Sequence, residues 1–509
     1  MRKLYQVWMP IFLVCLVAAT ANAQSFRVQC PTTTTLHKTP ATSANPVGGS
    51  IKCQQISGGD GFATMADGSQ TYLFAFGPLS GLNDLASGKP GTQSQATFMT
   101  PFDPAALAGS PASNGAVGLI PDPDASGAYT GHVDVRNIMD VGVLNGNIPA
   151  PMMAIDEDDE FFLTLTNVGM IMRPDLFEQH TVHFHGYPNA SGFYDGVPDA
   201  SVAINIGGSF TYYYLAPDAG TYFWHCHITP PEHLQMGMVG QLYVRPRQNR
   251  VPVGHSLYTG LLDQNNEIRT RNDCVADVLC STPAPASNIV TRAATGMYAY
   301  NDGDGSTHYD VEYPLQIHGF DPNFHFVGMT FNPEAFADMK DKYFLLNGRS
   351  YPDTVNTDGW SDISLAPGNS PFVGQPTQSK AIYTQSSDGV QRASQPLNAV
   401  INIPAGGKAL LRISDLDVSE YQTLASLGIP MQVIGYNARL LRDEAGANMY
   451  YNTNSITLAG GESLDVLLDA TDTTKYPAGS VFYLYTPQLD HLSNDAENFG
   501  GLMTEVRIN

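Results

Sequence analysis

The chain of 509 residues is 43% hydrophobic and only 14% charged, and its formal net charge at pH 7 is −23. A chain of this length and apolar content can bury large cores in two or three domains, and its 48 glycines and 35 prolines favour strands and turns over long helices. The negative charge argues against nucleic acid or an anionic membrane surface as a partner and favours cationic partners.

The N-terminal segment has the three parts of a secretory signal peptide. Two basic residues, Arg2 and Lys3, precede an apolar run, and the segment ends with the small residues Ala21-Asn22-Ala23. We therefore expect residues 1–23 to be a signal peptide that is removed before Gln24. No later stretch is long and apolar enough to predict a membrane span, so we expect an exported protein, periplasmic or extracellular.

Five cysteines remain after this segment is removed, and export permits them to form disulfides. Proximity in the sequence predicts the pairs Cys30–Cys53 and Cys274–Cys280. Cys226 is then the odd thiol.

Residues 24–70 are rich in Thr, Ser, Pro and Gly, and we expect a loosely structured arm held by one disulfide. Residues 71–246 form the first expected domain, because strand-like segments there are separated by turn clusters. This pattern is typical of a Greek-key β-sandwich. The expected strands are Tyr72–Phe76, Phe161–Asn167, Thr181–His185, Ser209–Leu215, Gly220–His225 and Gly240–Arg245.

A connector is expected at residues 247–295, and a second domain at residues 296–509. The second domain repeats the first in outline, since strand-like segments recur at corresponding places. These segments are Ala405–Ile413, Pro430–Gly435 and Gly479–Tyr485. The sequence therefore predicts an all-β chain made of two tandem sandwiches, and only the first has a complete set of blue-copper ligands at the corresponding positions.

Six of the chain's 13 histidines surround a single cysteine in residues 180–238. The motifs are His180-Thr-Val-His183-Phe-His185-Gly186 and His225-Cys226-His227, followed by His233 and Met238. Residues two apart on a strand share a face, whereas neighbours face opposite ways. One short segment can therefore serve two metal sites, with His225 and His227 on one side and Cys226 on the other.

A thiolate, two imidazoles and a weak thioether are the ligands of a blue-copper, or type 1, electron-transfer centre. Cys226, His180, His233 and Met238 supply this set. Four more imidazoles can meet at a second centre, and an electron leaving Cys226 crosses one residue of backbone to reach it. These four are His183, His185, His225 and His227.

Two other interpretations stay open at this point. Buried histidines often only satisfy hydrogen bonds, and imidazole together with thiolate also suits zinc. Met238 favours copper, because thioether ligands select soft metals.

The motifs resemble those of the multicopper oxidases, closely over residues 155–245 and loosely over both domains. The resemblance implies cupredoxin-like sandwiches. It also implies type 1 copper at His180, Cys226, His233 and Met238, and a trinuclear, oxygen-reducing copper cluster at the other four histidines. Two features depart from the family. The gap from His227 to His233 is two residues longer than usual, and two further His-x-His pairs that complete the cluster are missing.

The order of the domains, with type 1 copper in the first of two, resembles the copper nitrite reductases. Those enzymes are trimers whose type 2 copper takes its third histidine from a neighbouring subunit, and His491 is a candidate for that ligand. Their catalytic Asp falls at His183 and their catalytic His near Tyr436, so this proton-delivery pair is not kept. We expect His318 and His325 to be structural.

These features predict a copper oxidoreductase that takes single electrons from a phenolic donor or a reduced metal ion and passes them to dioxygen. Nitrite is the alternative acceptor, and a homotrimer is expected by analogy alone. A blue-copper electron carrier with no working second centre is the remaining alternative, and copper content separates these classes.

Overall fold

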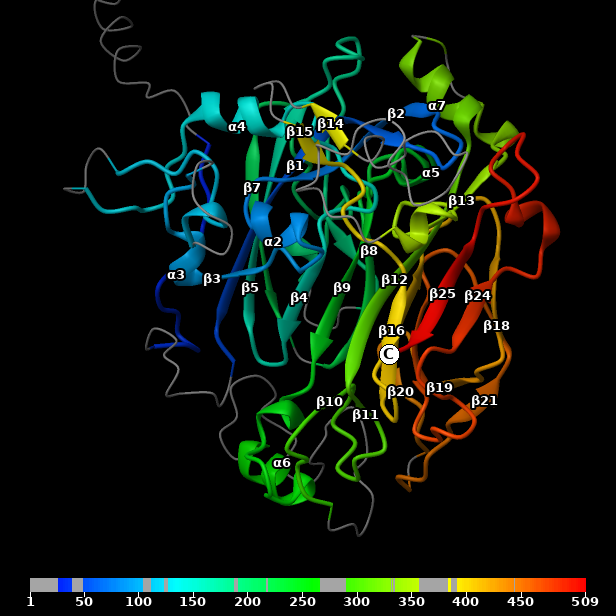
Figure 1. Ribbon diagram of the computed structural model, residues 1–509. Coiled ribbons are helices and arrows are strands. Elements are labelled where there is room, and N and C mark those ends of the chain that lie inside the picture. The colour runs from blue at the N-terminus through cyan, green and yellow to red at the C-terminus, as the bar shows by residue number, and fades with distance from the viewer. Residues whose placement is uncertain are drawn as a thin grey trace, which may run out of the picture.

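The computed structural model describes most of the chain between Phe26 and Asn509. The described residues are 26–38, 49–103, 111–122, 127–186, 191–216, 218–265, 290–330, 332, 335–356, 383–385, 391–443 and 445–509. The expected signal peptide and the expected Cys274–Cys280 disulfide lie outside these residues. Two β-sandwiches stand side by side, the first blue to green and the second light green to red (Figure 1). The prediction of an all-β chain with two tandem cupredoxin-like sandwiches is confirmed.

The first sandwich consists of two sheets with large aromatic side chains between them. One sheet has the order β2-β1-β5-β7 with β3 beside β1, and the other has the order β4-β9-β8-β6. Phe74, Phe161, Tyr212 and Trp224 are fully buried in this core. The bounds are β1 Ile51–Thr64, β2 Gln70–Pro78, β3 Gln93–Ser94, β4 Met153–Asp156, β5 Glu160–Gly169, β6 His183–Phe184, β7 Ser209–Leu215, β8 Gly220–His225 and β9 Val239–Arg245.

The second sandwich repeats this plan with an aliphatic core. Its sheets have the orders β13-β12-β17-β23-β19-β20, with β21 beside β19, and β16-β25-β24-β18-β22. The bounds are β12 Val311–Phe320, β13 Tyr343–Leu346, β16 Ile401–Ile403, β17 Lys408–Asp415, β18 Gln422–Leu427, β19 Met431–Tyr436, β20 Arg439–Leu440, β21 Tyr451–Thr453, β22 Ser455–Leu458, β23 Ser463–Asp469, β24 Val481–Tyr485 and β25 Met503–Ile508.

Helices and short hairpins lie outside the two sandwiches. The hairpins pair β10 Met297–Tyr298 with β11 His308–Tyr309, and β14 Tyr383–Gln385 with β15 Gln391–Ala393. The α-helices are α2 Leu82–Ala86, α3 Gln95–Phe98, α4 Val135–Gly142, α5 Pro230–Gln235, α6 Leu257–Asn265 and α7 Pro322–Met329. The 3-10 helices are η1 Pro111–Ser113, η2 Gly192–Tyr194, η3 Arg247–Arg250, η4 Phe336–Asp338, η5 Asp353–Val355 and η7 Leu489–Leu492. None of the helices in the described residues has the length and apolar character needed to cross a bilayer.

The expectation of a loosely structured arm over residues 24–70 is wrong for its second half. Residues 51–64 form β1, which pairs with β2 on one side and runs parallel to β5 on the other. A strand buried on both faces has no alternation of apolar and polar residues. The glycines and glutamines of β1 make this strand still harder to recognise in the sequence. The predicted Cys30–Cys53 disulfide is confirmed, and it ties the preceding segment to β1.

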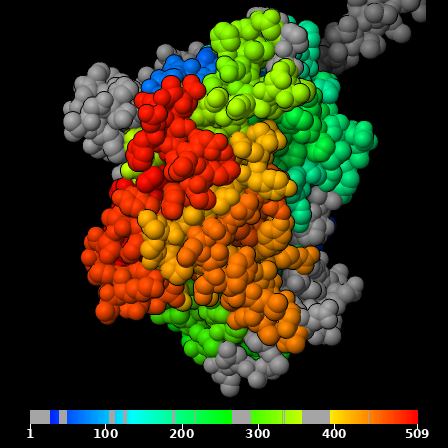
Figure 2. All heavy atoms as spheres, turned by 90° about the vertical axis from the view of Figure 1, so that its right-hand side faces the viewer, coloured from blue at the N-terminus to red at the C-terminus, as the bar shows by residue number. Residues whose placement is uncertain are grey.

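Buried hydrogen bonds join the two sandwiches through β8 and β9. Thr221 Oγ1 donates to Asp465 Oδ1 at 2.6 Å, and Ser463 Oγ donates to the Thr221 carbonyl at 2.6 Å. Gln241 Nε2 donates to the Arg412 carbonyl at 2.9 Å. Figure 2, seen from the side of the second sandwich, shows its yellow-to-red residues forming most of that face. The sheet that carries the His-Cys-His motif is therefore covered by the second domain.

Candidate metal centres

The two histidine motifs lie on neighbouring strands. His183 in β6 pairs directly with His225 at the end of β8, and Phe184 pairs with Trp224. Cys226 lies in the core of the first sandwich and is fully buried. The alternation predicted from the sequence is thus present, and it produces two separate clusters.

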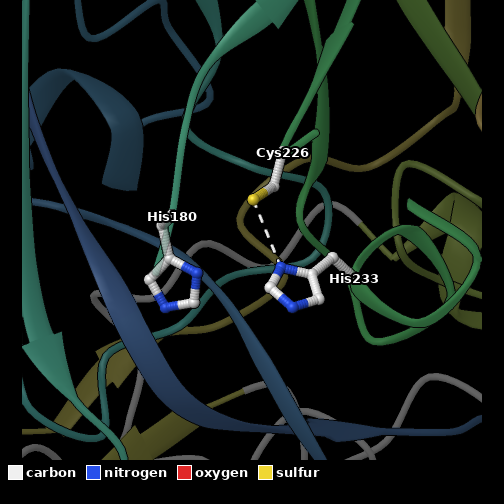
Figure 3. A group of neighbouring side chains, drawn as sticks. All are labelled: His180, Cys226 and His233. Carbon is white, nitrogen blue, oxygen red and sulfur yellow. Dashed lines mark hydrogen bonds between the residues drawn. The ribbon is translucent and has the colours of Figure 1, made fainter. Parts of the chain in front are cut away.

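The first cluster consists of His180, Cys226 and His233, whose candidate ligand atoms lie within 4.8 Å of one another (Figure 3). His233 Nδ1 is 3.2 Å from Cys226 Sγ. His180 is fully buried, and apart from the Cys226 thiol its ring nitrogens have no hydrogen-bond partner among the described residues. A buried imidazole with so few partners is costly, and a bound metal would remove that cost.

Electrostatics in this cluster favour a thiolate. Burial opposes ionisation of Cys226, but the nearby imidazoles of His233 and His180 outweigh it and hold the pKa of the thiol well below its ordinary value. Burial also disfavours a charged His233, and the Cys226 thiolate reverses this effect, raising the pKa of His233 to about 10. A site that stabilises a buried thiolate and an adjacent cation fits a thiolate-bound metal ion.

Met238 lies beside the same cluster. Its carbonyl accepts from the Cys226 N–H at 3.0 Å, and its own N–H donates to the His233 carbonyl at 2.8 Å. Gly58 in β1 explains the close packing, because a Cβ there would lie 2.6 Å from His180 Cδ2 and 3.3 Å from Met238 Cε. Sequence reasoning missed Gly58, since the contact joins segments more than a hundred residues apart.

Helix α5 accommodates the long gap between His227 and His233. Its N-cap, Thr229, has a left-handed backbone with φ of 37°, and prolines 230 and 231 occupy the first helical positions. Proline suits the start of a helix because no N–H bond is lost there. The two extra residues thus help to form a helical turn that places His233 in the first cluster.

The second cluster consists of His183, His185 and His225, whose ligand nitrogens also lie within 4.8 Å of one another. His183 Nδ1 lies 2.7 Å from the Asp195 carbonyl oxygen, and His225 Nδ1 lies 2.7 Å from the Cys226 carbonyl oxygen. His185 hydrogen-bonds to the backbone of Gly461 in the second domain. Burial lowers the pKa of His185 to about 4 and that of His225 well below the ordinary value, so both rings are neutral ligands at neutral pH.

His227 lies beside the second cluster but outside its three-membered group. Its ring centroid is 5.0 Å from that of His183 and 5.4 Å from that of His225. The side chain is partly exposed, and its backbone N–H donates to Thr181 Oγ1 at 2.9 Å.

The structure does not bring His491 into either cluster. Its ring is 1% exposed and stacks on Phe344 at 3.7 Å. Nδ1 lies 3.0 Å from Gln422 Oε1, and Nε2 lies 3.4 Å from Glu420 Oε2. To serve a neighbouring subunit, this ring would have to leave all of these contacts.

Two other histidines lie against helix α5. His318 Nε2 is 3.0 Å from the Leu234 carbonyl, and His325 Nε2 is 2.9 Å from the Gln235 carbonyl. Both side chains are buried, and they support the segment that carries His233. No sequence signal pointed to these long-range contacts.

Comparison with known proteins agrees with this geometry. The family model described as multicopper oxidase matches residues 130–249, which contain both clusters. Residues 130–249 are a multicopper oxidase domain. Its metal is copper, and the donor sets suit that ion, because thiolate and imidazole with a nearby thioether fit a type 1 centre and neutral imidazoles fit a second copper.

Similarity to individual proteins centres on this multicopper oxidase domain. The multicopper oxidase MCE of Talaromyces pinophilus is 32% identical over 126 residues, which are 24% of this chain and 19% of that protein. A copper-containing nitrite reductase of Neorhizobium galegae is 34% identical over 117 residues, 22% of this chain and 28% of that protein. The matches thus span less than a third of these relatives.

Solved structures show similarity over more of the chain. The blue copper oxidase from Nitrosomonas europaea gives a TM-score of 0.48 at 16% identity, over 90% of this chain and 85% of that one.

Proposed function

We propose that the protein is an exported copper oxidoreductase that takes single electrons from a donor at a type 1 centre and passes them to dioxygen at a second centre. The type 1 ligands are His180, Cys226, His233 and Met238. Copper supplies the one-electron redox chemistry when bound. The chain's own groups hold the ions, fix their ligands and connect the two centres.

The connection between the clusters carries this proposal. Cys226 belongs to the first cluster and His225, its neighbour in the chain, belongs to the second. The carbonyl of Cys226 also accepts from Nδ1 of His225 at 2.7 Å. One covalent step and one hydrogen bond therefore link the two sites, an arrangement that an electron carrier with one working site does not need.

The donor side of the first cluster is acidic. Glu178 Oε2 lies 3.6 Å from His233 Nε2, the ring nitrogen that points away from Cys226, and its side chain is 24% exposed. The His233 side chain lowers the pKa of this carboxyl, so it is ionised at neutral pH. A negative group at this edge, together with the net charge of −23, favours a reduced metal ion over a neutral phenol as the donor.

Nitrite is the second candidate acceptor, because a three-histidine site of the kind found here resembles the type 2 centre of copper nitrite reductases. A carboxylate at the edge of the site adds to this resemblance. Asp195 Oδ2 lies 3.6 Å from His183 Nδ1, and its side chain is partly exposed to solvent.

A single-turnover experiment on copper-loaded protein tests the proposal. Ferrous ion or a phenol added without oxygen should bleach the thiolate-to-copper absorption band, and dioxygen should restore it. In the variant His183→Ala, the donor should still bleach the band but dioxygen should restore it far more slowly. Cys226→Ser should have no band at all.

Each alternative gives a different result. If nitrite restores the colour and dioxygen does not, the enzyme is a nitrite reductase. If neither acceptor restores it in the unchanged protein, the chain is an electron carrier and the proposal is wrong.

A further inference from the structure

We infer that the second centre holds a single copper ion, bound within one chain by Nε2 of His183, His185 and His225. This inference rests on the proposed function for the identity of the metal. It departs from the trinuclear cluster that the family resemblance implies, and also from a site completed by a neighbouring subunit.

Backbone hydrogen bonds determine which nitrogen carries the proton in each of the three rings. A neutral imidazole carries one N–H, and a carbonyl oxygen can only accept. Because Nδ1 of His183 and Nδ1 of His225 each face a carbonyl at 2.7 Å, the proton of each ring lies on Nδ1. The backbone of Gly461 hydrogen-bonds to His185 and lies next to Nδ1 rather than Nε2 of that ring, so we place the proton of His185 on Nδ1 too. Metal-binding histidines are commonly oriented by such a bond from the second nitrogen.

The lone pairs that remain point at one another. His185 Nε2 and His225 Nε2 lie 3.0 Å apart, yet neither carries a proton that could form a hydrogen bond between them. Two acceptors at this distance repel unless a cation lies between them. Two nitrogens that each bind one divalent metal at about 2.0 Å come this close.

The number of histidines near the second cluster limits the site to one copper ion. All 13 histidines lie in the described part of the chain. Two serve the first cluster, three form the second, and beside these three only His227 is near. A trinuclear cluster needs eight in the family resemblance. Most of the others contact groups elsewhere: His37 contacts Glu160, His132 contacts Asp122, His308 contacts Thr295, His318 contacts Leu234, His325 contacts Tyr72, and His491 contacts Gln422.

The second domain completes the site from within the same chain. Gly461, in the turn before β23, has φ of 88°, and a Cβ there would lie 2.7 Å from His185 Cε1 and 2.8 Å from His185 Nδ1. Only glycine lets the turn approach the ring so closely. No group from another subunit is needed to orient any of the three ligands.

Copper analysis combined with electron paramagnetic resonance tests this inference. The unchanged protein should bind two copper ions per chain, one with a type 1 signal and one with a type 2 signal, and the integrated signal should account for both. His183→Ala, His185→Ala and His225→Ala should each lose the type 2 copper and keep the type 1 signal. His227→Ala should keep both ions.

A second pair of variants tests the role of the turn. Gly461→Ala should lose the type 2 copper, because its Cβ displaces His185, and should keep the type 1 signal. Gly479→Ala is the matched control, since Gly479 has a similar φ of 89° with nothing within 4 Å of a Cβ, and it should keep both ions.

More than two copper ions per chain, a silent fraction of the copper, or loss of the type 2 ion in His227→Ala would overturn the inference. One ion with only a type 1 signal would overturn it too. Two ions with both signals in a protein that does not react with dioxygen or nitrite would leave this inference standing and contradict the proposed function.

Discussion

At the scale of single residues, Asp353 is the buried acid with the clearest consequence for stability. Its side chain is 2% exposed, and neither carboxyl oxygen has a hydrogen-bond partner among the residues that the structure describes. Burial raises its pKa to about 7, although the charge of Arg349 opposes this effect. The folded protein therefore keeps this proton over a pH range in which the unfolded chain has lost it.

The sign of the resulting pH dependence follows from proton linkage. The pKa rises from 3.8 to about 7 on folding, so this residue's contribution to stability is complete below pH ~4 and is lost as pH rises to ~7. The loss is on the order of 4 kcal/mol. Asp353→Asn should remove this part of the slope, as measured by urea unfolding of the metal-free protein between about pH 4 and about pH 8.

An exposed aspartate provides the control for this measurement. Asp490→Asn, at a side chain that is 86% exposed, should leave the slope unchanged. Equal slopes in Asp353→Asn and in the unchanged protein would show that Asp353 is ionised when folded.

Residues that donate to a metal could be predicted from the sequence, whereas the residues that position them could not. The spacing of His180, Cys226 and His233 indicates a site because these side chains have distinctive chemistry. Gly58 and Gly461 contribute only the absence of a side chain, and their partners lie far away in the sequence. Backbone carbonyls, such as that of Asp195, have no sequence signature at all.

At the scale of secondary structure, helix α7 of the second domain supports helix α5 of the first. His325 on α7 lies between the Gln235 carbonyl at 2.9 Å and the Tyr72 carbonyl at 2.6 Å, and its single N–H donates to one of the two. The side chain of Gln235 is held in turn by Asp341 Oδ1 at 3.0 Å and by the Asp321 N–H at 3.0 Å. Helix α5, which carries His233, is therefore positioned by polar groups of the other domain.

His325→Phe should keep the stacking on Phe320 and lose the hydrogen bond of the imidazole N–H to a backbone carbonyl. We expect a loss of about 1–3 kcal/mol in the free energy of unfolding, because a carbonyl is left buried without a partner. The type 1 absorption and paramagnetic signals should also shift as His233 moves. Phe326→Ala, at a neighbouring side chain that is 61% exposed, is the control and should change neither. Unchanged type 1 signals in His325→Phe would show that α7 does not position helix α5 and its His233.

Strands rich in aromatic side chains were predictable, even where both faces are buried as in β8, whereas β1 was not. The predicted segments Ser209–Leu215 and Gly220–His225 coincide with β7 and β8. The predicted strand Thr181–His185 is shorter in the structure, because only His183–Phe184 pairs with β8. β1 escaped prediction because its glycines disfavour a strand locally, and because a local pattern cannot reveal its pairing with β2 and β5.

At the scale of the whole molecule, the packing of the two domains decides what the second centre can be. The sheet with His225 is covered by β17 and β23, and the turn at Gly461 reaches His185. The repeat of one sandwich in two copies could be predicted from the sequence. The way the copies face each other could not, because it depends on buried polar pairs such as Thr221 with Asp465.

The three Nε2 atoms of the second cluster bind one copper ion, and this limits the number of electrons that one chain can store. With one copper in each centre, a fully reduced chain stores two electrons. Two electrons and two protons convert dioxygen to hydrogen peroxide, whereas conversion to water needs four of each. We therefore expect peroxide to accumulate during turnover, and added catalase to halve the net uptake measured with an oxygen electrode. If catalase does not change the oxygen uptake, water is the product. The reaction would then use more electrons than the two copper ions of one chain can store.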